Sequence, residues 1–188
     1  ARKKALREAD LVILAGVPCD FRLDYGQHIN HQAKIISINL SRKDLYMNRK
    51  PTRGILADPG MFLINISQKN YKENNWDNWY KILLERDQQR NNEISRQAEE
   101  KTDFINPLKI CMALNRHIQE GDHIVADGGD FVAIASYILQ PRSLSGWLDP
   151  GVFGTLGVGA GFVLGAQLTH PESVVWALYG DGAFGYSL

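Results

Sequence analysis

The sequence predicts an α/β fold in which parallel sheets are flanked by helices. Short apolar runs rich in β-branched residues recur along the chain, and each has the character of a buried strand. Segments long enough for crossovers separate these runs, which is the order that parallel strands require. Two runs end directly in glycine turns that carry aspartates, at Asp127–Asp130 and Gly180–Ala183. Because ligands of doubly wound sheets bind at the carboxyl ends of strands, we expect these two turns to line one crevice.

Residues 1–67 are predicted to form the later part of a nucleotide-type α/β domain. A helix at the start of the chain precedes a strand over residues 11–16, and the continuous apolar character of that strand indicates cover on both faces. A second buried strand is expected over residues 34–40. A short strand over 55–58 follows, and then a helix beginning at Pro59, because proline suits the first helical turn.

Residues 68–103 are predicted to form a polar, partly helical linker. The composition changes there to Asn, Lys, Glu, Gln and Arg, and several larger apolar side chains are spaced to fall on one helical face. These side chains are Trp76, Trp79, Tyr80, Leu83 and Leu84. We interpret them as a stripe by which the linker packs on its own domain, and a partner-binding stripe is the alternative.

Residues 104–188 open a second α/β pattern. Asn106-Pro107 can cap and begin a helix, because Asn suits the capping position and Pro the first helical position. A short strand over residues 123–126 then runs into Asp127–Asp130, and an apolar helical stretch follows over 132–139. The order of strand, glycine turn, acid and helix returns at the end of the chain.

The stretch from Val152 to Leu168 has no charged residue, which raises the question of a membrane-spanning helix. Its glycines argue against one, because glycine is unfavourable in an isolated helix and the stretch is short for a bilayer. A glycine-rich loop feeding a buried helix explains the pattern better, and the four-residue spacing of Gly157, Gly161 and Gly165 would suit close helix packing. The absence of a Walker lysine argues against a P-loop ATPase.

The last apolar run delivers Asp181 to a Gly-Asp-Gly turn. Glycines on both sides let the backbone fold sharply and approach a ligand closely. A carboxylate at the end of a strand is a hard oxygen donor suited to Mg²⁺, which in such a place usually bridges to phosphate. The alternative is an ordinary Asp-Gly turn after a core strand.

Charge and cysteine content exclude several classes of protein. Twenty-one basic and 21 acidic residues give zero formal net charge, which points to no nucleic-acid partner and no anionic membrane surface. Cys19 and Cys111 lack the spacing of a zinc site or a disulfide framework, and we interpret them as buried, unreactive thiols in a reducing compartment. No signal peptide is visible. The composition is that of ordinary soluble protein, and the abrupt ends suggest an internal fragment of a longer enzyme.

Three motifs in order, Asp127–Phe131, Gly151–Gly159 and Gly180–Gly185, resemble the pyrophosphate domain of thiamine-diphosphate enzymes. The resemblance falls in the branch of acetolactate synthase, oxalyl-CoA decarboxylase and 2-hydroxyacyl-CoA lyase. Residues 11–66, with Asp20-Phe21-Arg22 after the first strand, similarly resemble the later part of that family's central domain. The resemblance implies a thiamine-diphosphate- and Mg²⁺-dependent carbon–carbon lyase that cleaves 2-hydroxyacyl-CoA to an aldehyde and formyl-CoA.

The resemblance also implies roles for individual residues. Asp181 would ligate Mg²⁺, and the backbone of Gly182 and Ala183 would hold the pyrophosphate. Leu156 would prop the cofactor in its bent conformation, where many relatives have Met. Asp130 is electrostatically awkward beside a pyrophosphate. The full cofactor-binding set is Asp127, Gly128, Gly129, Asp130, Gly154, Thr155, Leu156, Gly180, Asp181, Gly182 and Ala183.

The family's activating glutamate and its second metal ligand, an Asn, are expected outside this fragment. No catalytic residue is therefore predicted within it, and the fragment alone is not expected to be active. The resemblance further implies a homodimer or homotetramer, because the cofactor of this family lies between two subunits. It also implies that a central domain can hold FAD or ADP as its nucleotide. It further implies a role in fatty acid α-oxidation. The expected location is the cytosolic face of the endoplasmic reticulum membrane, with an anchor in a missing N-terminal region. The alternatives are acetolactate synthase or oxalyl-CoA decarboxylase chemistry, and a non-catalytic relative that binds thiamine diphosphate or a nucleotide.

Overall fold

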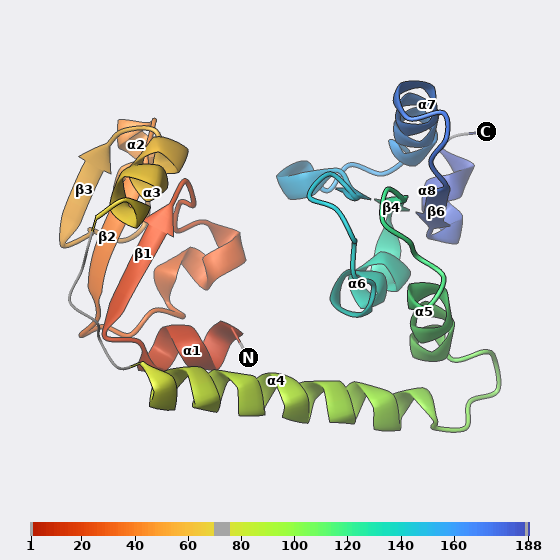
Figure 1. Cartoon of the computed structure of the whole chain (residues 1–188), viewed down its shortest axis with the longest axis horizontal. Coiled ribbons are helices and arrows are strands. Elements are labelled where there is room, and N and C mark those ends of the chain that lie inside the picture. Colours follow the sequence, from red (N-terminus) through yellow and green to blue (C-terminus); the bar gives the residue numbers. More distant parts are fainter. Residues whose placement is uncertain (1, 70–75, 187) are drawn as a thin grey trace. The chain divides into compact units, whose positions relative to one another are not determined.

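The computed structural model describes residues 2–69, 76–186 and 188. The chain divides into two compact units, Ala1–Arg90 and Asn91–Leu188, and each is an α/β unit with its own parallel sheet (Figure 1). Part of the predicted linker, residues 70–75, lies outside the described residues. The predicted fold class, parallel sheets flanked by helices, is confirmed.

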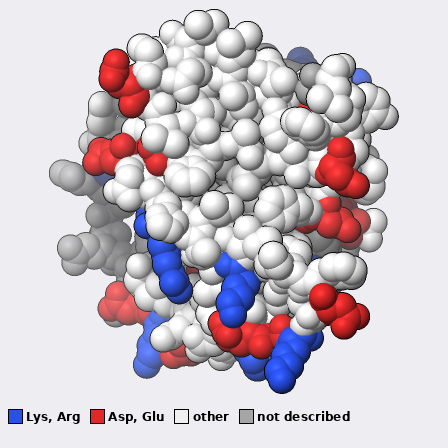
Figure 2. Space-filling view, turned by 90° about the vertical axis from the view of Figure 1, so that its right-hand side faces the viewer, with Lys and Arg blue, Asp and Glu red and all other residues white. Residues whose placement is uncertain are grey.

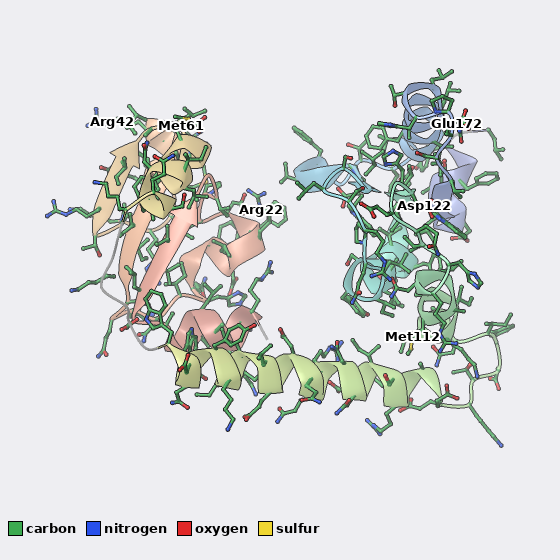
Figure 3. All side chains as sticks on the ribbon, in the orientation of Figure 1. Arg22, Arg42, Met61, Met112, Asp122 and Glu172 are labelled. Carbon is green, nitrogen blue, oxygen red and sulfur yellow. The ribbon has the colours of Figure 1, made fainter. Side chains whose placement is uncertain are left out.

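The first unit is built on a sheet of three parallel strands in the order β1-β2-β3. Its elements are α1 (Arg2–Glu8), β1 (Leu11–Ala15), the 3₁₀ segment η1 (Phe21–Gly26), β2 (Lys34–Asn39), α2 (Arg42–Leu45), β3 (Arg53–Leu56) and α3 (Pro59–Ser67). Arg22, which Figure 3 labels, lies in the segment after β1, and Asp20 pairs with its guanidinium at 2.7 Å. The predicted third strand is displaced because Asp58 caps α3, where it accepts a hydrogen bond from Met61 N at 2.8 Å.

The prediction that β1 is covered on both faces is wrong for the described residues. Val12 and Leu14 are buried, whereas Leu11 and Ile13 are 46% and 45% exposed. Side chains alternate between the two faces of a strand, so only the face that carries Val12 and Leu14 enters the core. That core consists of Val12, Leu14, Cys19, Leu23, Ile29, Ala33 and Ile35.

The helix α4 (Asp77–Ala98) runs across the boundary between the two units. Within the first unit, Arg86 forms an ion pair with Glu8 of α1 at 2.6 Å. Trp79 is half-buried and, with Leu11 and Ile13, lines a cavity of about 580 Å³. Tyr80, by contrast, is 64% exposed, so the predicted stripe packs on its own unit only in part.

The second unit has three parallel strands in the order β5-β4-β6. Its elements after α4 are α5 (Pro107–Asn115), β4 (His123–Asp127), α6 (Gly129–Ile138), β5 (Trp147–Leu148), the 3₁₀ turn η2 (Gly151–Phe153), α7 (Gly159–Thr169), β6 (Val175–Tyr179) and α8 (Asp181–Gly185). The central strand β4 is buried at all five positions. Its core cluster contains Cys111, Ile118, Ile124, Ala135, Leu139 and Leu178.

Both cysteines are free and buried, as the sequence indicates. Burial raises the pKa of the Cys19 thiol and of the Cys111 thiol above their ordinary values. A raised pKa keeps a thiol protonated and therefore a weak nucleophile. The interpretation of these residues as unreactive thiols is consistent with this environment.

The uncharged stretch after β5 forms a glycine-rich loop followed by α7, as predicted. Within the described residues the helix is not buried as expected, because Leu164 and Leu168 are 61% and 73% exposed. A side chain added at Gly161 or Gly165 would meet nothing within 4 Å, so no helix packs closely there among the described residues. Within that described part of the chain, no helix is both long enough and apolar enough to cross a membrane.

Candidate functional site

The two aspartate-bearing glycine turns lie at the same edge of the second sheet. Asp127 and Tyr179 are register partners at the carboxyl ends of the parallel strands β4 and β6. Directly after them, Gly180 N donates a hydrogen bond to the carbonyl oxygen of Asp127 at 2.9 Å. The two turns therefore lie at the same edge of the sheet, and the expectation that they line one crevice stays a prediction.

The glycine-rich loop joins the two turns at Gly128. A Cβ atom added to Gly128 would lie 2.5 Å from the Cβ atom of Ala183 and 3.0 Å from Cδ2 of Leu156. Only glycine lets these three segments approach so closely, and its φ of +80° is also one that other residues rarely adopt. The three motifs, separate in sequence, thus meet at one point.

Asp127 has a different position from the one that the sequence predicts. Its side chain is fully buried, at 0% exposure, and does not border an open site. Its two carboxylate oxygens accept hydrogen bonds from the backbone, Oδ1 from Gly157 N at 3.2 Å and Oδ2 from Gly159 N at 2.7 Å. All five residues of β4 are buried, so the strand has no alternation of buried and exposed side chains that could have revealed the position of Asp127.

Asp130 is exposed in the first turn of α6. The helix begins at Gly129, earlier than predicted, because Gly128 and Gly129 both adopt positive φ and turn the chain directly from strand to helix. A carboxylate in a first turn is stabilised by the positive end of the helix dipole. This environment explains how an acid is tolerated at Asp130 without a basic partner.

Asp181 is the first residue of the short helix α8 and is exposed. The preceding residue, Gly180, has no side chain to cap this helix, so the first N–H groups of α8 have no side-chain acceptor. A side chain added at Gly182 would meet nothing within 4 Å. An exposed carboxylate beside open backbone N–H groups fits a divalent cation together with a phosphate group.

The predicted ring-contacting residues lie on the loop between η2 and α7. Gly154 has a left-handed conformation with φ of +58°, and Thr155 is exposed. Leu156 is 47% exposed while its Cδ2 atom approaches Gly128. A branched apolar side chain therefore stands at the meeting point of the motifs with part of its surface available to a ligand.

The segment that carries the predicted site residues, 117–188, has few basic side chains. Between residues 117 and 188 the sequence has a single Lys or Arg, Arg142, and its guanidinium donates hydrogen bonds to Gln140 Oε1 and Asn115 O. On the face shown in Figure 2, the foremost Lys and Arg side chains lie in the lower part, whereas Asp and Glu side chains are also found higher up. Phosphate charge at this edge would have to be balanced by a cation and by backbone N–H groups.

Tyr179 is a residue that the sequence reasoning did not single out. Its ring contacts Phe184 of α8 edge-on, with centroids 5.5 Å apart, and a Cβ atom added to Gly159 would lie 2.6 Å from its Cε1 atom. Burial, and then the charge of Asp127, raise the pKa of Tyr179. Its place as the last residue of a strand beside a glycine turn is the sequence signal that could have identified it.

The described residues contain no group of three or more His, Cys, Asp or Glu side chains that could hold a metal. Asp181 would be the sole carboxylate ligand that this part of the chain offers at α8. A separate cavity of about 460 Å³ lies along β5 and α7 and includes His123 and His170, but none of the predicted site residues lines it.

Comparisons with known proteins agree with this geometry. Residues 127–188 match the family described as thiamine pyrophosphate enzyme, C-terminal TPP binding domain. The whole chain is 46% identical to 2-hydroxyacyl-CoA lyase 2 of Danio rerio and 41% identical to 2-hydroxyacyl-CoA lyase 2 of Homo sapiens, and it spans 31% and 30% of their lengths. It is 29% identical to a probable acetolactate synthase of Mycobacterium bovis, of which it spans 34%. The chain thus covers about a third of the curated relatives that it matches.

Proposed function

We propose that the protein containing this chain is a thiamine-diphosphate- and Mg²⁺-dependent carbon–carbon lyase of the thiamine pyrophosphate enzyme family. The match of residues 127–188 to that family and the identity with relatives named 2-hydroxyacyl-CoA lyase 2 support this proposal. The substrate of this lyase would be a 2-hydroxyacyl-CoA, which the reaction divides into an aldehyde shortened by one carbon and formyl-CoA. Atoms balance in this cleavage, because the hydroxyl-bearing carbon leaves as the aldehyde and the thioester carbon leaves as the formyl group.

The observation that carries the proposal is the convergence of three glycine motifs at one sheet edge. Leu156 and Ala183 both crowd Gly128, while Asp181 stands exposed beside them. Such an edge can accept a ligand with a charged phosphate end and an aromatic body. That combination fits thiamine diphosphate, which the family match also indicates.

We assign the residues of this edge as follows. Asp181 would ligate Mg²⁺, with phosphate oxygens and water among the further ligands. The N–H groups of Gly182 and Ala183 would hold the pyrophosphate, and Gly154 to Leu156 would lie against the aminopyrimidine. Bound thiamine diphosphate supplies a carbon nucleophile and then an acceptor for the electron pair of the broken bond. The protein's residues hold the cofactor in one orientation and exclude water from it.

The scarcity of Lys and Arg in residues 117–188 supports the metal ion in this proposal. A pyrophosphate next to Asp130 and Asp181 would be repelled unless a cation lay between them. Arg142, the single Lys or Arg in this part of the sequence, is engaged by Gln140 and Asn115. A divalent cation at Asp181 would provide the missing positive charge.

The lyase reaction is favoured over acetolactate synthesis by the pattern of similarity. Identity reaches 46% with a relative named 2-hydroxyacyl-CoA lyase 2 and 29% with one named probable acetolactate synthase. Acetolactate synthesis is the second candidate, because the chain is also similar to the relative named probable acetolactate synthase.

We also propose at least a homodimer, because the exposed apolar side chains of α7, including Leu164 and Leu168, suit a surface that another domain or subunit covers.

A steady-state assay tests the proposed reaction. The intact protein, saturated with thiamine diphosphate and Mg²⁺, is supplied with a 2-hydroxyacyl-CoA or with pyruvate, and aldehyde, formyl-CoA and acetolactate are measured. We expect aldehyde and formyl-CoA in equal amounts from the first substrate. Acetolactate from pyruvate, with no aldehyde from the acyl-CoA, would favour the second candidate and reject the lyase.

A further inference from the structure

We propose that Asp127 is a positioning residue, whose buried carboxylate holds the glycine-rich loop against the end of β4 so that the cofactor meets Leu156 and the Gly180–Ala183 turn in one fixed geometry. This inference rests on the proposed function of the site. It concerns a residue that would not touch the cofactor, because the Asp127 side chain is fully buried.

The hydrogen bonds of Asp127 show how it can hold the loop. Oδ2 accepts from Gly159 N at 2.7 Å, and Oδ1 accepts from Gly157 N at 3.2 Å. Burying a carboxylate is costly unless it is hydrogen-bonded, and bonds from N–H groups to a charged oxygen are stronger than neutral ones. The two loop N–H groups therefore stabilise the buried carboxylate, and the carboxylate in turn fixes the positions of Gly157 and Gly159.

The loop lacks a cap of its own. Gly159 is the first residue of α7, and Val158, which precedes it, provides no side-chain hydrogen bond to the helix. Asp127 supplies this acceptor from the neighbouring strand, and its negative charge lies at the positive end of the helix dipole. One side chain from β4 thus caps α7.

Asp127 is also bonded to the other motif. Its carbonyl oxygen accepts a hydrogen bond from Gly180 N at 2.9 Å, one residue before Asp181. The carboxylate holds the residues directly after Leu156, and the carbonyl holds the turn directly before the proposed metal ligand. The separation of the two cofactor-contacting segments is consequently set through this single residue.

Asp122, which Figure 3 labels, directly precedes the opposite end of β4 and offers a control. It is also buried, at 6% exposure, and its Oδ2 atom accepts hydrogen bonds from Gln119 N at 2.9 Å and from Trp176 Nε1 at 2.8 Å. It bonds neither the glycine-rich loop nor the Gly180 turn. An Asp→Asn change at either position removes a buried carboxylate. At Asp127 the new NH₂ group must face one of the two loop N–H donors, whereas at Asp122 the remaining carbonyl oxygen can keep both hydrogen bonds.

The test compares Asp127→Asn and Asp122→Asn in the intact protein. We measure the dissociation constant of thiamine diphosphate with Mg²⁺, kcat at saturating cofactor, the near-ultraviolet circular dichroism of the bound cofactor, and the unfolding temperature. Both variants should unfold at lower temperature. Asp127→Asn alone should weaken cofactor binding roughly tenfold or more, equivalent to about 1.4 kcal/mol, and should change kcat and the dichroism of the bound cofactor.

Several results would overturn the proposal, and they can be told apart. Wild-type cofactor affinity and kcat in Asp127→Asn would reject positioning while leaving the proposed function intact. Equal losses of affinity in both variants would reduce Asp127 to a general structural role. If the wild-type protein binds no thiamine diphosphate, the proposed function itself fails and this inference with it.

A second measurement covers the case in which Asp127→Asn does not fold. Hydrogen exchange of the wild-type protein without cofactor should find the amides of Gly157 and Gly159 protected, because Asp127 accepts from both. Exchange at these two amides as fast as in an exposed loop would overturn the inference without any variant.

Discussion

At the scale of single residues, the site depends on how closely backbones approach at Gly128. We predict that Gly128→Ala lowers the free energy of unfolding of the intact protein by about 1–3 kcal/mol, since the new Cβ atom would overlap Ala183 at 2.5 Å. Urea denaturation measures the change. The variant should also bind thiamine diphosphate more weakly, because Leu156 and Ala183 would be pushed apart.

The neighbouring Gly129 provides the control for this substitution. Its φ of +73° is also positive and unfavourable for alanine, but an added Cβ atom would meet nothing within 4 Å. Gly129→Ala should therefore lose only the conformational part of the stability, about 1 kcal/mol. Equal losses in both variants would mean that close contact at Gly128 is not important.

We predict that Tyr179 makes the free energy of unfolding depend on pH at alkaline pH. Its pKa is raised by burial and by Asp127, so the folded state holds the phenolic proton more tightly than the unfolded state, whose pKa is about 10. This contribution to stability is present below that pH and is lost as the pH rises through the folded-state pKa. Above about pH 10, the unfolding free energy of the wild type should fall more steeply than that of Tyr179→Phe. Parallel curves for the two proteins would contradict this account.

At the scale of elements, α5 depends on a cap that also ties it to α4. The Asn106 side chain accepts a hydrogen bond from Leu108 N at 3.0 Å and donates one to Gln97 O at 2.8 Å. Asn106→Ala should cost about 1–2 kcal/mol of stability, measured by thermal unfolding. Asn106→Asp keeps the acceptor and loses the donor, so it should cost less; a larger loss than that of alanine would show that the cap contributes little.

The elements that could be predicted are those whose signals are local. The helices α3 and α5 both begin at proline and were expected from that residue. Asn106 was also expected as a cap, whereas Asp58, which caps α3, had been placed in the preceding strand. The two-residue strand β5 has too few residues for a pattern and was not predicted. The early start of α6 was missed as well, because it depends on the positive φ of Gly128 and Gly129, which the residue types permit but do not require.

At the scale of the whole molecule, the sequence predicts which segments form the site but not how each side chain is used. The order of the three motifs placed Asp181, Gly128 and Leu156 together, and the structure brings them to one edge. The position of Asp127 beneath the loop could not be predicted, since it depends on a contact between residues 32 positions apart. The residue-level roles in cofactor binding, and the domain boundaries at 67 and 103, stay predictions.

The exposure of apolar side chains also belongs to this scale. The sequence of α7 and β1 indicates buried elements, yet Leu168 and Leu11 are 73% and 46% exposed in the described residues. Apolar periodicity indicates that one face of an element is buried, but it does not identify the segment that covers that face. The chain spans about a third of its curated relatives. Cover of these faces by other parts of the protein or by a second subunit stays a proposal.

The measurement that tests the central claim most directly is calorimetric binding of thiamine diphosphate to the intact protein, with and without Mg²⁺. The wild type is compared with Asp181→Ala and with Glu172→Ala, a control that removes an exposed acid before β6, away from the glycine turns. We predict Mg²⁺-dependent binding by the wild type and the control, and a loss of at least about tenfold in Asp181→Ala, equivalent to about 1.4 kcal/mol. Unchanged, metal-dependent binding by Asp181→Ala, or no binding by the wild type, would contradict the account.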